Sequence, residues 1–448
     1  MIQKACLTQE DFQKQNSMLT HPLPFCEDVS ILSDSVNIVG RILPNRLVCQ
    51  AMEGCDGNAD GTPGELTARR YRRIAEGGSG LIWFEATAVL PEARANPRQL
   101  RISESNLDAF KAQVEEIREA AFKACGHAPT VIMQATHSGR YSKPEGVPAP
   151  LIACNNPILE RDRPIPADRI VTDEYLDRTK EALVRAASLA ERAGFDGVDI
   201  KCCHRYLNSE LLSAFGRAGR YGGSLENRTR LLRESISGAI QSCSSGFIVT
   251  TRLNAYDGLP YPYGFGVHPE RAGFDPTEPV WLLKKLAEAG VKLVDITMGN
   301  PYFNPHINRP FATGAYEPPE APIEGVARML NGTALLKRAV PELTLVCSAL
   351  TYLGAVSPNV AAAFIRDGGF DLAGYGRMIL AYPDFANDII KSGALVSGKC
   401  CIACSKCSEI MRAGGTPGCV VRDSGIYLPV YRKYCARQQT GTERTVII

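Results

Sequence analysis

Short apolar segments alternate with longer amphipathic ones along most of the chain. Eight short segments are mostly apolar and end in polar or glycine residues, which is typical of buried strands; they lie at 46–52, 80–85, 130–134, 197–200, 247–252, 291–297, 343–347 and 370–373. The segments between them carry apolar residues at helical spacing, at 65–75, 107–123, 174–193, 225–241, 281–289, 324–340, 359–367 and 385–391.

Eight strand–helix alternations predict an α/β fold, a (β/α)₈ TIM barrel of about 250 residues plus insertions. A doubly wound sheet is the alternative, but the Gly-x-Gly-x-x-Gly fingerprint that usually accompanies it is not found in the sequence. We expect a lead-in segment at 1–37, the barrel at 38–393, and a cysteine-rich segment with a tail at 394–448. The long connections at 138–172, 254–278 and 300–324 are expected to shape a functional site.

Composition excludes several classes of protein. The 448 residues are 45% hydrophobic and 22% charged, and a net charge of +2 gives no reason to expect nucleic acid or a membrane surface as a partner. No apolar run reaches the ~18 residues that a membrane span needs, and the N-terminus has no signal-peptide core. We therefore expect a cytoplasmic protein, and we leave open whether it forms a homo-oligomer.

Ionisable residues gather where the fourth predicted strand ends. Lys201, His204, Arg205 and Tyr206 follow the strand at 197–200. In a barrel of this class the functional side chains lie on the loops after the strands. The other strand ends contribute polar or sulfur-bearing candidates, namely Met52, Gln134, Arg252 and His306.

Five of the sixteen cysteines cluster near the C-terminus, at positions 400, 401, 404, 407 and 419. Such a cluster indicates metal binding more than a disulfide framework, which suits small secreted proteins. Cys401, Cys404, Cys407 and Cys419 are separated by two, two and eleven residues, and Cys400 is an alternative to Cys401. Four thiolates suit either a [4Fe–4S] cluster or a tetrahedral zinc ion, and the spacing alone does not distinguish them.

Four motifs together resemble the old yellow enzyme family of FMN-dependent barrels, and more narrowly its iron–sulfur branch, which includes 2,4-dienoyl-CoA reductase and trimethylamine dehydrogenase. They are Gln134–Tyr141 (QATHSGRY), Tyr221–Arg228 (YGGSLENR), Gly376-Arg377 followed by Pro383-Asp384, and the cysteine cluster. The resemblance covers about residues 38–425. The cysteine spacing departs by one residue from the 2,4-dienoyl-CoA reductase pattern, and the resemblance favours a cluster over zinc.

The resemblance implies an FMN site. Met52 and Ala86 would line the flavin, Gln134 would bind its pyrimidine edge, and Arg252 would lie beside N1 and O2. A fixed guanidinium there stabilises the negative charge of a reduced flavin. The phosphate would lie across the last two strands, on Ser348, Ala349, Gly376 and Arg377.

The resemblance also implies a substrate site. Tyr206 would protonate the alkene carbon after hydride transfer, with His306 assisting, because a phenol is a weak acid that can release a proton in a dry pocket. Lys201 and His204 would polarise the substrate carbonyl, although family members commonly have histidine at the first position. Arg205 stands where many members have glycine, and would contact either an acidic substrate or a surface carboxylate.

Three functions follow as hypotheses. The first is an ene-reductase that passes hydride from FMN to an electron-poor C=C of an enone, enoate or enoyl thioester. The second is an amine dehydrogenase of the trimethylamine dehydrogenase type. The third is an electron-transfer module without a small substrate of its own. Residues 420–448 are too few for the flavin- and pyridine-nucleotide-binding domains of longer relatives, so we expect electrons either from NAD(P)H directly or from a separate electron-donor protein.

Overall fold

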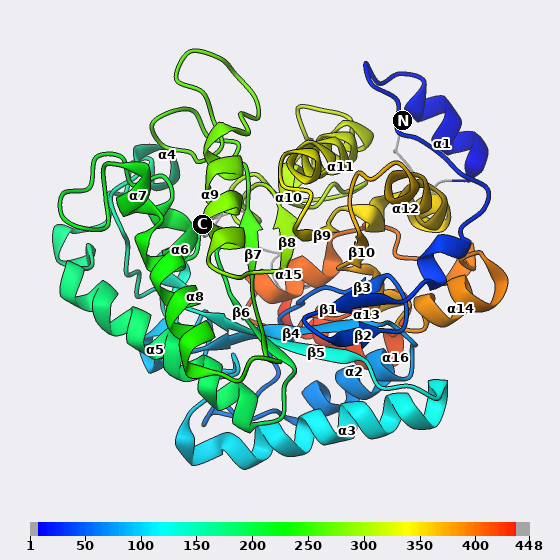
Figure 1. Cartoon of the computed structure of the whole chain (residues 1–448), viewed down its shortest axis with the longest axis horizontal. Coiled ribbons are helices and arrows are strands. Elements are labelled where there is room, and N and C mark those ends of the chain that lie inside the picture. Colours follow the sequence, from blue (N-terminus) through cyan, green and yellow to red (C-terminus); the bar gives the residue numbers. More distant parts are fainter. Residues whose placement is uncertain (1–7, 436–448) are drawn as a thin grey trace.

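The computed structural model describes residues 8–435. Residues 1–7 of the expected lead-in segment and residues 436–448 of the expected tail lie outside the described residues. Eight strands form a closed parallel barrel in the order β10-β3-β4-β5-β6-β7-β8-β9 (Figure 1). They are β3 Leu47–Cys49, β4 Leu81–Ala88, β5 Thr130–Thr136, β6 Gly197–Ile200, β7 Ile248–Asn254, β8 Leu293–Thr297, β9 Thr344–Cys347 and β10 Leu372–Tyr375. Each overlaps one of the eight expected strands, which confirms the predicted barrel.

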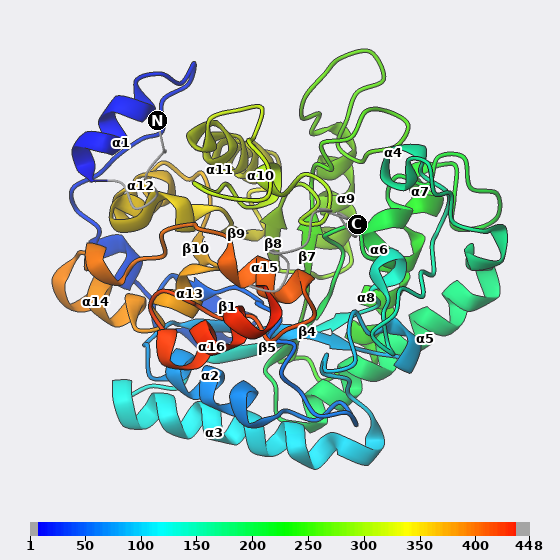
Figure 2. The ribbon, with the colours of Figure 1, turned by 180° about the vertical axis from the view of Figure 1, so that it is seen from behind.

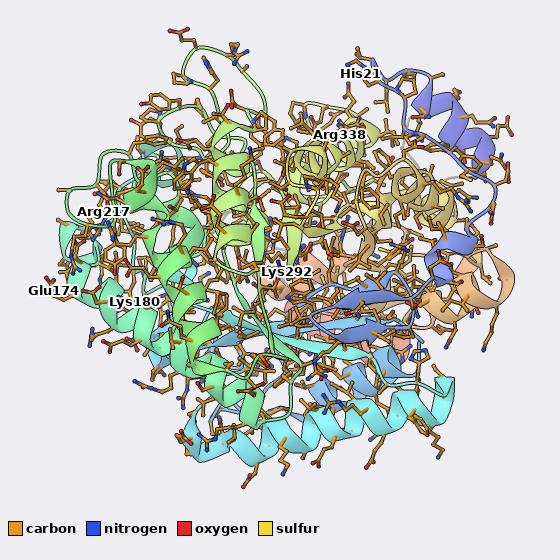
Figure 3. The ribbon with its side chains drawn as sticks, in the orientation of Figure 1. His21, Glu174, Lys180, Arg217, Lys292 and Arg338 are labelled. Carbon is orange, nitrogen blue, oxygen red and sulfur yellow. The ribbon has the colours of Figure 1, made fainter. Side chains whose placement is uncertain are left out.

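An outer layer of helices surrounds the barrel and buries its apolar residues against the strands. Its main members are α2 Glu65–Ala75, α3 Leu107–Cys125, α5 Asp173–Arg192, α8 Arg230–Ser242, α9 Thr277–Glu288, α11 Pro322–Ala339, α12 Ser357–Arg366 and α14 Phe385–Ser392. Their outward faces are polar, as Glu174, Lys180 and Arg338 show (Figure 3). None of the helices in residues 8–435 is long and apolar enough to span a membrane.

Several short helices lie outside this layer. The α-helical ones are α1 Gln9–Asn16, α4 Pro157–Glu160, α6 Leu207–Leu211, α7 Leu225–Arg228, α10 Pro305–Asn308 and α13 Met378–Ala381. The helix expected at 225–241 is divided into α7 and α8. The division falls at Thr229, whose ψ of −2° departs from the helical value and whose hydroxyl donates a hydrogen bond to the carbonyl of Leu225.

A two-stranded hairpin closes one end of the barrel. Its strands are β1 Val36–Ile38 and β2 Arg41–Leu43, which pair antiparallel. Ile38 and Leu43 are buried in one apolar cluster with inward residues of the barrel such as Trp83. The hairpin therefore covers the end at which the strands begin, and the candidate functional residues gather at the other end.

The segment after the barrel folds over this other end (Figure 2). It contains α15 Lys406–Arg412 and α16 Ser424–Tyr434. The guanidinium of Arg69, on α2, donates two hydrogen bonds to Asp423, and Arg98 donates one to the carbonyl of Gly414. These contacts hold the cysteine segment against loops that follow the first two barrel strands.

Candidate active site

Arg252 is a buried cation held at the end of β7. Its backbone N–H donates to Asp199 Oδ1 at 2.7 Å, and its Nε lies 3.0 Å from Asp295 Oδ2 in an ion pair that is not aligned as a hydrogen bond. Gln134 donates to the other oxygen of Asp199 at 2.6 Å. Burial raises the pKa of both carboxyls, that of Asp295 to about 7, despite the nearby Arg252. The barrel thus fixes a guanidinium whose terminal nitrogens make no hydrogen bond to any residue in 8–435.

Gln50 was not singled out from the sequence, but it ties this group to the last strands. Its amide donates to Asp295 Oδ1 at 2.8 Å and to Ser348 Oγ at 2.7 Å. The hydroxyl of Ser348 in turn donates to the carbonyl of Ile296 at 2.7 Å. Ser348 therefore orients the interior network, and its expected contact with a phosphate stays a prediction.

The ends of β9 and β10 form an anion cradle. Ala349 has a positive φ of 73°, which non-glycine residues rarely adopt, and the 3₁₀ helix Leu350–Val356 follows it. The backbone amides of Gly376 and Arg377 follow β10. Among the turn and loop hydrogen bonds of residues 8–435, neither amide donates to a backbone carbonyl. Nη1 of Arg377 is buried without a partner, whereas Nη2 donates to Pro310 at 2.6 Å. Free amides and an unpartnered guanidinium nitrogen fit the phosphate of FMN.

The two residues expected beside the flavin ring lie near this network. Met52 is half-buried, and its sulfur lies 3.5 Å from where a side chain on Gly376 would begin. Ala86 is buried on β4 just after a break in the strand register, and its carbonyl accepts a hydrogen bond from Gln99. Both positions are compatible with the expected roles, which stay predictions.

Three tyrosines form the centre of the candidate substrate site. The hydroxyls of Tyr206 and Tyr302 lie 2.9 Å apart, and the ring of Tyr302 stacks on that of Tyr141 at 3.9 Å. Asn300 donates a hydrogen bond to the hydroxyl of Tyr141. Burial raises the pKa of all three phenols, that of Tyr141 to about 12, so each keeps its proton at neutral pH.

The residue that contacts the hydroxyl of Tyr206 is Tyr302, whereas the sequence had suggested His306 as the residue that assists Tyr206. His306 lies four residues further along the loop, half-buried, with Nδ1 2.6 Å from the hydroxyl of Tyr316. Burial and then the charge of Arg328 lower the pKa of His306. No contact between His306 and Tyr206 is present in residues 8–435, so assistance from His306 stays a prediction. Tyr302 could have been noticed in the sequence, but the role of assisting Tyr206 was given to His306 because histidine is a common proton donor.

Lys201 places its ammonium over the ring of Tyr206, 3.9 Å from the ring centre. The side chain is buried, which lowers its pKa. Glu53, which the sequence analysis also missed, is near enough to interact with Lys201 through space, and its Oε1 accepts a hydrogen bond from Asn96 at 2.8 Å. Burial raises the pKa of Glu53, against the lowering effect of Lys201. A cation and a carboxyl thus flank the tyrosines.

The turn after β6 orients these groups. His204 and Arg205 both have positive φ, 63° and 58°, so the backbone turns sharply at the end of the strand. His204 is half-buried; its partial removal from water lowers its pKa, and the charges of Lys201 and Arg252 lower it further. A neutral imidazole beside Tyr206, with ring centres 6.5 Å apart, is suited to donate one hydrogen bond to a substrate.

Arg205 corrects one expectation. It is fully buried and donates to Asp257 Oδ2 at 2.9 Å and to the hydroxyl of Ser213. Asp257 is itself buried and accepts a further hydrogen bond from Asn254. The carboxylate that Arg205 contacts is therefore the buried Asp257 and not a surface group, and the pair fixes the turn that carries His204 and Tyr206. Nε and Nη2 of Arg205 have no hydrogen-bond partner in residues 8–435, so a contact with an acidic substrate stays a prediction.

The Arg205–Asp257 pair gives a stability prediction. Replacing Asp257 with asparagine leaves a buried guanidinium without its counter-charge, and we expect a loss of about 3–5 kcal/mol in the free energy of unfolding. Denaturant unfolding of the holoenzyme measures this loss. Asp168→Asn is the matched control, because Asp168 is 77% exposed in its pair with Arg169 and should cost at most about 1 kcal/mol. Equal losses in the two variants would contradict the assignment.

Four cysteines line one cavity beneath α15. Cys401, Cys404, Cys407 and Cys419 line a small cavity of about 20 Å³ together with Arg377. Cys400 is not part of the lining, and its sulfur donates to the carbonyl of Val396. In residues 8–435, no three His, Cys, Asp or Glu side chains converge on a single-ion site. The four cysteines thus lie around one shared cavity.

The loop that carries Tyr302 is attached to this cysteine segment. The amide of Ala312 donates to the carbonyl of Ala403 at 3.2 Å, and Arg309 reaches the hydroxyl of Ser405 at 3.4 Å. Burial, and then the charge of Arg377, lower the pKa of Arg309 to about 9. Hydrogen bonds therefore join the loop that carries Tyr302 to the segment that lines the cysteine cavity.

A closed parallel barrel with a fixed interior guanidinium and an anion cradle on its last two strands defines a flavin-binding barrel. The model of the NADH:flavin oxidoreductase / NADH oxidase family matches residues 36–267, just over half of the chain. The chain belongs to this family and is an FMN-dependent oxidoreductase.

Similar proteins agree with this assignment. An NADPH dehydrogenase of Halalkalibacterium halodurans is 33% identical over 274 residues, 60% of this chain and 73% of the relative. One of Geobacillus thermodenitrificans is 31% identical over 265 residues, 58% of this chain and 70% of the relative.

Solved structures share the fold at low identity. A 2-naphthoyl-CoA reductase in complex with 2-naphthoyl-CoA has a TM-score of 0.72 at 19% identity; the match covers 91% of this chain and 58% of that one. An old yellow enzyme homologue from Zymomonas mobilis has a TM-score of 0.62 at 20% identity, covering 82% and 94%. Histamine dehydrogenase from Rhizobium sp. 4-9 has a TM-score of 0.64 at 20% identity, covering 88% and 52%.

Proposed function

We propose that the protein reduces electron-poor C=C bonds, with hydride from FMN and a proton from Tyr206. The observation that carries the proposal is the pair of neutral phenols, the buried Tyr206 and the half-buried Tyr302, whose hydroxyls lie 2.9 Å apart beside a cation. FMN supplies the hydride chemistry when bound. Arg252 would lie against its pyrimidine end, and Gly376 and Arg377 would hold its phosphate.

The residues divide the remaining work. Lys201 and His204 hold and polarise the group conjugated to the alkene. Tyr206 gives its proton to the carbon next to that group, and Tyr302 is placed to return a proton to Tyr206 through their shared hydrogen bond. His306 remains a second candidate for this resupply. The aromatic rings exclude water, which keeps the proton transfer local.

An amine dehydrogenase is the second candidate. It is suggested by two proteins of similar fold that are named a histamine dehydrogenase and an amine oxidase. The site itself argues against it. The ammonium of Lys201 already lies over the Tyr206 ring, where aromatic rings would hold an amine cation. A second cation there would be repelled by Lys201.

We also propose that the four cysteines lining the cavity, Cys401, Cys404, Cys407 and Cys419, hold a [4Fe–4S] cluster that passes electrons to or from the flavin. Four cysteines that line one cavity can supply the four thiolates of such a cluster. The resemblance of their spacing to the iron–sulfur branch favours the cluster over a zinc ion. Arg377 and Arg309 would offset the negative charge of the thiolate-bound cluster. NADPH, named for the similar dehydrogenases, is the proposed electron donor, with a separate donor protein as the alternative.

Anaerobic purification with flavin and iron analysis, followed by assays of NADPH oxidation, tests the proposal. Alkenes with conjugated ketone, acid or thioester groups should support NADPH consumption and yield saturated products. Amines should neither reduce the flavin nor change its spectrum. Reduction of the flavin by amines, with no alkene accepted, would favour the second candidate. A protein that contains flavin but accepts no small molecule would be an electron-transfer module.

A further inference from the structure

Among residues 8–435 no carboxylate forms an ion pair with the ammonium of Lys201, and we infer that this ammonium binds a carboxylate on the substrate. The inference rests on the proposed reduction of C=C bonds and narrows the substrate class to α,β-unsaturated carboxylic acids. Only 5% of the Lys201 residue is exposed. A buried charge is costly unless it is paired, so a ligand that supplies the opposite charge gains from this position.

The nearby carboxylates form hydrogen bonds with residues other than Lys201. Glu53 and Asp199 attract Lys201 through space, but neither forms an ion pair with it in the part of the chain that the structure describes. Oε1 of Glu53 accepts from Asn96 and from the thiol of Cys55.

The oxygens of Asp199 accept from Trp83 and Gln134 on one side and from the amide of Arg252 on the other. Lys201 makes no hydrogen bond through its ammonium to any residue in 8–435, apart from its contact with the Tyr206 ring. The ammonium is therefore available to a ligand.

A second positive charge strengthens the preference for an anion. Arg252 is near enough to Lys201 to repel it, and the ion pair of Arg252 with Asp295 offsets only part of that charge. A neutral ketone or amide would accept one hydrogen bond from Lys201 and leave its charge uncompensated. A carboxylate would provide both the hydrogen bond and the charge.

The chemistry of the step also favours a cation here. Hydride arriving at the β-carbon of an unsaturated acid breaks the C=C π bond and pushes the electron pair toward a carboxylate that is already negative. An ammonium in contact with that carboxylate offsets the extra charge, which a neutral imidazole donor does far less well. Tyr206 then gives a proton to the α-carbon, and NADPH restores the two electrons taken from FMN, so that the acid, NADPH and one proton yield the saturated acid and NADP⁺.

Matched ligands test the inference on the anaerobically purified holoenzyme. Binding of 3-phenylpropionate and 3-phenylpropionamide, followed by changes in flavin absorbance, compares a carboxylate with a neutral group of the same shape. We expect the acid to bind at least about 30-fold more tightly, and Lys201→Gln to remove most of that difference while changing amide binding by less than about threefold. Lys180→Gln is the control and should change neither; Lys180 lies on α5, in a half-exposed pair with Glu234 (Figure 3).

Turnover separates this inference from the proposed function. Cinnamate should be reduced faster than cinnamamide by the wild type, and Lys201→His should shift the preference toward 2-cyclohexenone. If the acid and the amide bind equally well, or if Lys201→Gln weakens both equally, the inference is wrong even where 2-cyclohexenone is reduced. If no alkene of the set, acid or neutral, is reduced, the proposed function itself fails.

Discussion

Replacing Tyr206 with phenylalanine is expected to slow reoxidation of the reduced flavin by an alkene about 10²–10⁴-fold, the usual contribution of a positioned general acid. Reduction of the flavin by NADPH should stay within about twofold of the wild type. The reason is that the hydroxyl of Tyr206 is hydrogen-bonded to that of Tyr302 and makes no contact with Arg252 or Gln134 in residues 8–435. Stopped-flow measurement of the two half-reactions under anaerobic conditions separates these effects.

Tyr302→Phe is the companion variant. It keeps the stacked ring against Tyr141 but removes the hydroxyl that contacts Tyr206, so we expect about a tenfold loss in the alkene half-reaction. His306→Gln should have a smaller effect, because His306 bonds to Tyr316 and not to Tyr206. A large loss in His306→Gln together with an unaffected Tyr302→Phe would reverse the two assignments.

Replacing Cys404 with alanine is expected to remove the iron–sulfur chromophore and lower iron from about four atoms per chain to near zero. Cys404 lines the cysteine cavity, whereas Cys400 lies outside its lining and contacts Val396. Cys400→Ala should therefore keep its iron, and this variant decides which neighbour is the ligand. Iron, sulfide and zinc analysis with visible spectra measures both outcomes.

The same pair of variants tests the link between the cavity and the substrate loop. The loop is bonded to the cysteine segment through Ala312 and Ala403, so loss of the cluster should weaken substrate binding while flavin content is kept. Cys243→Ala, at the end of α8, is the control for removing a thiol. One zinc per chain and no sulfide in the wild type would contradict the proposed cluster.

The barrel could be predicted because each strand is a short apolar run followed by a helix of clear periodicity. Arg252 and Gln134 could be recognised as candidates because each is a polar residue at the end of an otherwise apolar predicted strand. The hairpin at Val36–Leu43 was missed because three-residue strands carry too little pattern to recognise. The divided helix at Thr229 was missed because one residue with an altered ψ leaves no trace in hydrophobic spacing.

The partners within the site could not be predicted, because they come from segments far apart in the sequence. Tyr302 meets Tyr206 across 96 residues, and Gln50 meets Asp295 across 245. The sequence left open whether Arg205 meets an acidic substrate or a surface carboxylate, and it could not show that the carboxylate beside Arg205 is the buried Asp257, 52 residues away. The choice of Cys401 over Cys400 as a lining residue likewise depends on which way each of two adjacent side chains points.

The most direct test of the account is the oxidative half-reaction of the wild-type holoenzyme. The flavin is first reduced anaerobically with one equivalent of dithionite and then mixed with an alkene, with flavin absorbance and product followed together. The account predicts that an alkene conjugated to a carboxylate or carbonyl reoxidises the flavin and appears as one equivalent of saturated product. A flavin that stays reduced in the presence of every such alkene, and is reoxidised only by an electron-transfer protein, would contradict it.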